Sequence, residues 1–146
     1  MKRYAVLVPL LSGCLFAGVS AEGDGEGMFK YRTQVMYASI GHLEALRAYV
    51  DGELPLRRHV PEHVDALLAL NALYPMLFPP GSQHPESRAL PAVWSDPRGL
   101  RLAIEYNRRA ILALKQVDPG DRQALKRAVN QVRMSCGDCH YYYRRR

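Results

Sequence analysis

Two cysteines and a histidine near the end of the sequence, Cys136, Cys139 and His140, stand in the order C-x-x-C-H. On a helix the two cysteines project from the same side, about one turn apart. Their sulfurs can then form thioether bonds to the two vinyl groups on one edge of a porphyrin, and the histidine can bind the iron. This pattern is the attachment signature of c-type haem. The sequence therefore predicts one covalently bound haem c, with His140 as an iron ligand.

Two other kinds of chemistry also use closely spaced cysteines. A thioredoxin-like redox pair lies at a helix N-terminus, where the helix dipole lowers a thiol pKa, whereas Cys136 and Cys139 fall late on a predicted helix. A zinc site needs two further ligands. The other histidines form no second cluster in the sequence, and we expect them at the surface or in loops: His42, His59, His63 and His84. The motif therefore favours haem.

The N-terminal segment, residues 1–21, has the pattern of a secretory signal peptide. Two basic residues precede an apolar run with small residues toward its end, and we expect cleavage after Ala21. An alternative is a lipobox that ends at Cys14, in which case a lipid on that cysteine would anchor the protein to a membrane. The expected location is periplasmic, with membrane contact only if Cys14 is lipidated.

The remainder divides into a polar leader, residues 22–27, which we expect to be disordered, and a domain over residues 28–146. A 48% apolar composition is enough for one hydrophobic core. The full sequence holds 20 basic and 14 acidic residues. Removal of the predicted signal takes away two basic residues and no acidic one, which leaves a net charge of +4. Without a basic and aromatic groove pattern, this mild excess does not predict nucleic-acid binding.

Hydrophobic periodicity predicts four helices. They are expected from near Met28 to Asp51, from 60 to 73, from Pro97 to about Gln116, and from Asp118 through the cysteine motif. Gly52 is expected to end the first helix, and Ser95 or Asp96 to cap the third. Residues 75–97 contain six prolines and are expected to form an irregular crossover. Without a strand signal, the pattern predicts an all-α, antiparallel four-helix bundle.

The first and fourth predicted helices each carry a stripe of residues on one face. On the first helix this stripe comprises Phe29, Arg32, Met36, Ile40, Leu43, Arg47 and Val50. On the fourth helix it leads straight into the cysteine motif and comprises Leu125, Val129, Val132, Cys136, Cys139, His140 and Tyr143.

Three stretches of the sequence resemble the cytochrome c′ family, the class II c-type cytochromes, whose haem motif lies near the C-terminus. They are Lys30-Tyr31-Arg32 with Met36, Leu90-Pro91-Ala92-Val93-Trp94-Ser95-Asp96, and Cys136 to His140 followed by Tyr143-Arg144. The resemblance covers nearly all of the chain that follows the predicted signal. It implies a bundle with haem between its helices, His140 on one face of the haem and the first helix across the other.

The resemblance also implies roles for two arginines. Arg32 corresponds to an arginine that pairs with a haem propionate, and its place on an apolar stripe agrees, because a buried arginine needs an anion. A side chain that snorkels to solvent is the alternative for Arg32. Arg144 matches a basic residue beside the proximal histidine, and its alternative is a terminal surface charge.

Met36 matches the position that faces the iron on the distal side in this family. If Met36 only packs over the iron, the haem is five-coordinate and can bind small gases such as NO and CO, which is the outcome we expect. If its thioether binds the iron, the protein is a low-spin His/Met electron carrier like cytochrome c556. The stripe offers no acid–base residue for an enzyme such as a peroxidase, so we expect a non-enzymatic cytochrome. Redox partner proteins and a homodimer through the first helix are also expected.

Overall fold

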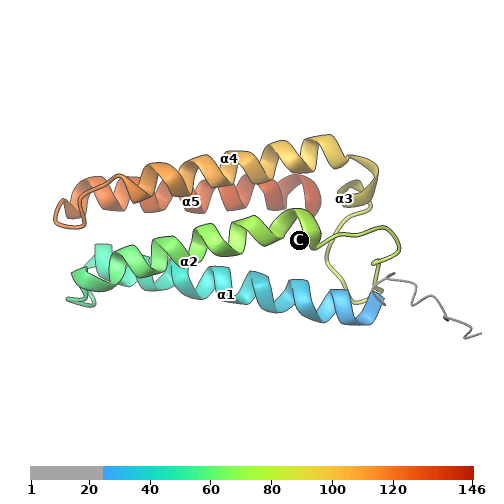
Figure 1. The fold of residues 1–146 in the computed structure, drawn as a ribbon, viewed down its shortest axis with the longest axis horizontal. Coiled ribbons are helices and arrows are strands. Elements are labelled where there is room, and N and C mark those ends of the chain that lie inside the picture. The colour runs from blue at the N-terminus through green and yellow to red at the C-terminus, as the bar shows by residue number, and fades with distance from the viewer. Residues whose placement is uncertain (1–24) are drawn as a thin grey trace, which may run out of the picture.

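The structure is a computed structural model that describes residues 25–146, so the predicted signal peptide and Cys14 lie outside the described residues. Four long helices lie side by side, and successive ones run in opposite directions (Figure 1). They are α1 (Gly25–Asp51), α2 (Val60–Leu73), α4 (Pro97–Lys115) and α5 (Arg122–Tyr143). Within residues 25–146 there is no strand, and no helix is long and apolar enough to cross a membrane. The predicted all-α four-helix bundle is confirmed.

Two helices begin at other residues than the sequence predicted. α1 begins at Gly25, so the last three residues of the predicted leader form its first turn. α5 begins at Arg122 rather than at Asp118, because the Asp118 carboxylate accepts hydrogen bonds from the Gly120 amide at 2.8 Å and from Arg57 Nη2 at 3.0 Å. These bonds hold a turn, and the helix starts only after Asp121, whose side chain accepts from Ala124 N.

The crossover between α2 and α4 lies at the end of the bundle where α1 begins (Figure 1). It contains two short helices that the sequence did not predict, η2 (Tyr74–Met76) and α3 (Ala92–Ser95). Trp94 Nε1 donates to the carbonyl of Pro79 at 3.0 Å, which ties α3 to the earlier part of the crossover. The Asp96 carboxylate then caps α4 by accepting from the Gly99 amide at 2.9 Å, as predicted.

The buried side chains form two apolar clusters. The first joins all four long helices toward the other end of the bundle and comprises Leu43, Leu46, Tyr49, Val50, Val60, Val64, Leu67, Ala110, Ile111, Leu114, Leu125, Val129 and Val132. The second lies at the crossover end and comprises Val93, Leu100, Ile104 and Tyr143. Cys136 packs against the first cluster and Cys139 against the second. The C-x-x-C-H motif therefore lies where the two clusters meet.

The predicted stripe on α1 is only partly the buried face. Leu43 and Val50 are buried as expected, but Ile40 is 53% exposed and Met36 is half-buried. The first half of α1 is anchored to the crossover and to η2 through Arg32 and Ser39, not to the first apolar cluster. The residues that α1 buries are therefore not simply those that recur every three or four positions along the predicted stripe.

Two histidines that the sequence placed at the surface contact each other instead. His42 on α1 and His63 on α2 are half-buried, and their Nδ1 atoms lie 2.9 Å apart. One ring nitrogen must therefore carry a proton and donate it to the other, which accepts as a neutral imidazole. The expectation of ordinary surface histidines was wrong for this pair.

The histidine pair predicts a loss of stability in mild acid. Burial lowers the pKa of His63, the charges of His42 and His59 add to that shift, and Glu62 opposes it. The unfolded chain therefore takes up a proton at a higher pH than the folded chain does. The contribution to stability is complete above the ordinary histidine pKa of about 6.5 and is lost as the pH falls through the lower folded value. Urea unfolding at several pH values should show this fall, and H63Q should flatten it. An unchanged pH profile in H63Q would contradict the assignment.

Candidate haem site

The two cysteines of the motif project from the last turns of α5 as free, half-buried thiols. Burial raises the pKa of Cys136, although a hydrogen bond from Asn107 opposes the shift. Burial, with a contribution from the neighbouring Cys136, raises the pKa of Cys139 to about 11. Both thiols are thus protonated near neutral pH. A thioredoxin-like pair requires the opposite shift, so the burial of these thiols does not favour that alternative.

His140 follows Cys139 directly and leaves much of its side chain open to solvent. Partial desolvation of the ring lowers the pKa of His140, and the guanidinium groups of Arg144 and Arg88 lower it further. These effects favour the neutral imidazole, which is the form that binds a metal. Arg144 thus lies close enough to His140 for its charge to act on the imidazole.

Arg32 is a buried cation with too few partners. Its side chain is 4% exposed, and Nη1 donates to the carbonyl of Ser82 at 2.9 Å. Its Nε and Nη2 have no hydrogen-bond partner. Three aromatic rings surround the guanidinium with centroids 5.7 to 5.9 Å away: Phe29, Phe78 and Trp94. The snorkelling alternative is therefore wrong, because the group is held inside without an anion.

A haem with its carboxylate side chains fits this arrangement. A buried guanidinium with two unsatisfied donors is costly unless an anion accepts from it. The buried donors of Arg32 that have no partner therefore indicate a negatively charged group beside α1.

The alternative of a zinc site needs a set of ligands. Among residues 25–146, no group of three histidine, cysteine or acidic side chains is arranged to bind a metal ion.

Met36 lies on α1 across from the cysteine motif. Two contacts fix the antiparallel register of α1 and α5: Lys126 Nζ lies 2.7 Å from Asp51 Oδ1, and the Arg122 guanidinium lies over the Tyr49 ring. Each step back along α1 is matched by a step forward along α5. Continuing that register places Met36 opposite residues 135–141. The structure thus brings Met36 to the level of the motif, and Arg32 lies one turn nearer the crossover.

Tyr74 links the two sides of the site, and the sequence did not single it out for this role. Its hydroxyl donates to Ser39 Oγ on α1 at 2.8 Å. Burial raises the pKa of Tyr74 to about 12; the bond to Ser39 opposes the shift, and the charges of Cys136 and Cys139 add to it. Tyr74 therefore bonds to α1 while its ring packs against the second apolar cluster, which Cys139 also contacts. No local signal distinguishes it from the other tyrosines of the chain.

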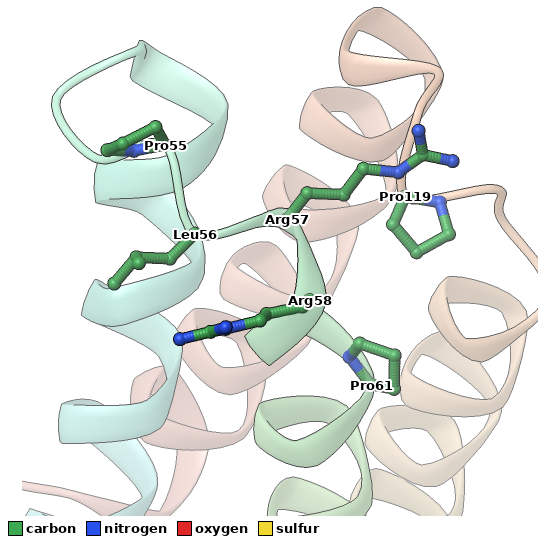
Figure 2. A pocket seen from close by; sticks show the side chains of 6 residues that line it. All are labelled: Pro55, Leu56, Arg57, Arg58, Pro61 and Pro119. Carbon is green, nitrogen blue, oxygen red and sulfur yellow. The ribbon is translucent and has the colours of Figure 1, made fainter.

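A hollow at the opposite end of the bundle is not part of this site. Figure 2 shows its lining side chains, which come from the two connections at this end, including the short helix η1 (Arg57–His59), and from the first turn of α2: Pro55, Leu56, Arg57, Arg58, Pro61 and Pro119. Both arginines have partners, since Arg57 pairs with Asp118 and Arg58 Nε donates to His59 Nε2 at 3.2 Å. The hollow is lined by no cysteine and no histidine, so it has none of the residues of the C-x-x-C-H motif.

Comparison with known proteins gives a consistent result. The family model described as cytochrome C′ matches residues 27–144. The chain is 31% identical over 121 residues to cytochrome c′ from Pararhodospirillum photometricum, covering 82% of this chain and 97% of that protein. It is 28% identical over 123 residues to cytochrome c′ from Alcaligenes xylosoxydans xylosoxydans, covering 83% of this chain and 95% of that protein.

Solved structures show the same similarity. A nitric oxide complex of a variant cytochrome c′ from Alcaligenes xylosoxidans superposes with a TM-score of 0.77 at 28% identity, covering 85% of this chain and 98% of that chain. Cytochrome c′ from Rubrivivax gelatinosus superposes with a TM-score of 0.74 at 25% identity, covering 83% of this chain and 97% of that chain. A cysteine motif on the last helix of a four-helix bundle and these full-length matches agree, and the chain belongs to the cytochrome c′ family, which binds one covalently attached haem c.

Proposed function

We propose that this chain is a periplasmic monohaem cytochrome in which Cys136 and Cys139 bind the haem by thioether bonds and His140 is the proximal iron ligand. The observation that carries the proposal is the buried, unpaired guanidinium of Arg32, which lies on the helix opposite the motif. A neutral imidazole is the form of His140 that binds iron, and the lowered pKa of His140 favours that form. The bound iron would supply reversible one-electron exchange and a position for a small gas.

The two arginines hold and orient the cofactor in this proposal. Arg32 would hold a haem propionate through Nε and Nη2, which are the only buried side-chain donors without a partner in residues 25–146. The three rings around the guanidinium exclude water and strengthen this charge pair. Arg144 keeps a positive charge near His140 and so favours its neutral form.

On the distal side, we assign Met36 a packing role and leave the sixth iron position free for NO or CO. Relatives support gas binding, because nitric oxide and carbon monoxide complexes of cytochrome c′ from Alcaligenes xylosoxidans have been solved. Neither a histidine nor a carboxylate lies between Arg32 and Ile40 on α1, so the site lacks a general acid–base group on that helix. Electron transfer or NO handling fits this site better than enzymatic turnover.

The outer face of α1 supports a homodimer. Tyr37 and Ile40 are largely exposed there, and a Cβ on Gly41 would meet no atom within 4 Å. An open apolar face on one helix is typical of a surface that a second copy covers. Redox partner proteins complete the proposed set of partners.

Absorption spectra of the haem-loaded protein test the proposal. The oxidised protein should be high-spin, the reduced protein should shift when CO is added, and M36A should behave in the same way. M134A, which removes an exposed methionine from α5, is the matched control. A low-spin spectrum that CO does not change, and that M36A converts to high-spin, would instead place Met36 on the iron. A chain without haem would overturn the proposal as a whole.

A further inference from the structure

Three buried polar side chains cross the bundle beside the cysteine motif. Asn71 on α2, Asn107 on α4 and Ser135 on α5 are each at most 4% exposed. Asn71 Nδ2 donates to Asn107 Oδ1 at 2.9 Å, and Asn107 Nδ2 donates to Ser135 Oγ at 2.8 Å. This polar chain links three helices at the level where the two apolar clusters meet.

The polar chain ends on a sulfur atom. Asn107 Nδ2 also lies 3.4 Å from Cys136 Sγ, within hydrogen-bond distance for sulfur. An amide nitrogen has two hydrogens, so one can serve Ser135 and the other Cys136. The donors of Asn107 are therefore fully used, and one of them is aimed at an atom of the haem motif.

The direction of every bond in the polar chain is fixed by backbone carbonyls, which can only accept. The Ile104 carbonyl accepts from Asn71 Nδ2 at 3.3 Å, so this amide nitrogen must also face Asn107 Oδ1. The Val132 carbonyl accepts the Ser135 hydroxyl proton at 2.7 Å, so Ser135 Oγ is an acceptor for Asn107. If the Asn107 amide were flipped, its nitrogen would face the Asn71 amide nitrogen, which is also a donor, and its oxygen would face Ser135 Oγ, which is also an acceptor. Its N–H group is thus held toward Cys136.

We propose that Asn107 is a positioning residue for the haem: its N–H group holds the Cys136 sulfur in place and raises the reduction potential. The inference rests on the proposed function, in which that sulfur is a thioether. A thioether sulfur keeps a lone pair and still accepts a weak hydrogen bond. The positive end of the N–H dipole then lies beside the porphyrin edge and favours the haem that holds one electron more. Groups around a redox centre tune its potential in this way.

The test compares midpoint potentials of haem-loaded variants by spectroelectrochemistry. N107L has a similar volume and no donor, so its potential should shift to a more negative value than that of the wild-type protein. S135A is the matched control, because it removes the other acceptor of the same amide and leaves the bond to Cys136; its potential should stay near the wild-type value. Equal shifts in N107L and S135A, or none in N107L, would overturn the inference.

Two further measurements keep the result interpretable. The spectrum of each denatured variant in alkaline pyridine reports whether haem is still attached by thioether bonds, so a failure of the proposed function shows up there and not in the potential. If N107L does not fold, the double variant N71L/S135A replaces it. This variant removes both groups that orient the Asn107 amide, the donor to its oxygen and the acceptor of its other N–H. The amide is then free to turn away from Cys136, so the potential should shift in the same direction, and an unchanged potential would overturn the inference.

Discussion

Replacing both Cys136 and Cys139 by alanine should abolish covalent haem attachment completely. These are the two cysteines within residues 25–146, and both are free thiols that face the junction of the two apolar clusters. Thioether bonds survive denaturation, whereas iron ligation by histidine does not. Haem staining after denaturing electrophoresis should therefore be strong for the wild-type protein and absent for C136A/C139A. Intact mass should show the same difference.

The control for this experiment is D138A, which changes an exposed residue between the two cysteines and should keep the haem. The two single cysteine variants extend the test, because each leaves one thiol and should retain haem through a single bond. Covalent haem in the double variant would show that another residue carries the attachment, and the assignment of the motif would then be wrong.

The second large effect is expected for R32L, which should destabilise the protein with haem but not the protein without it. In the haem-loaded protein the substitution removes one partner of a buried ion pair, and this should lower the free energy of unfolding by about 3–5 kcal/mol. In the C136A/C139A background without haem, the same change removes a buried cation whose Nε and Nη2 have no partner. Leucine there should be neutral or should stabilise the chain by about 1–4 kcal/mol.

Denaturant unfolding of the four proteins measures this difference. R47L is the matched control: Arg47 lies on the same helix, but its ion pair with Glu44 is exposed, so its removal should cost at most about 1 kcal/mol in either form. If R32L changes both forms by the same amount, the Arg32 guanidinium does not pair with the haem. Arg32 would then serve only to anchor α1 to the crossover through its bond to Ser82.

Local chemistry explains why much of the fold could be predicted from the sequence. α2 covers the predicted residues, because its first turn contains Pro61 and the next proline, Pro75, ends the apolar run. Asp96 with Pro97 marked the start of α4, since a carboxylate cap and a proline in the first turn are local preferences. The cysteine motif could be recognised because its chemistry depends on the spacing of three residues within one helix.

Other features depend on contacts between distant residues and left no local signal. The direction in which Ile40 points follows from how α1 meets the crossover, and the pairing of His42 with His63 follows from the register of α1 and α2. Asn71 and Asn107 did leave a weak signal, because each interrupts an apolar helix face. Their bonds to each other and to Cys136 could not be predicted, because they join three helices that are far apart in the sequence.

The position of the two cysteines at the junction of the apolar clusters has a consequence for biosynthesis. A chain made from its N-terminus completes α1, α2 and α4 before α5 exists. The first cluster includes Leu125, Val129 and Val132 of α5, and the second includes Tyr143 of the same helix. Neither half of the interior can close until the segment that holds both thiols has been made. The two thiols are therefore made before the interior around them can close, and the docking of the last helix is the step that encloses whatever has been attached to them.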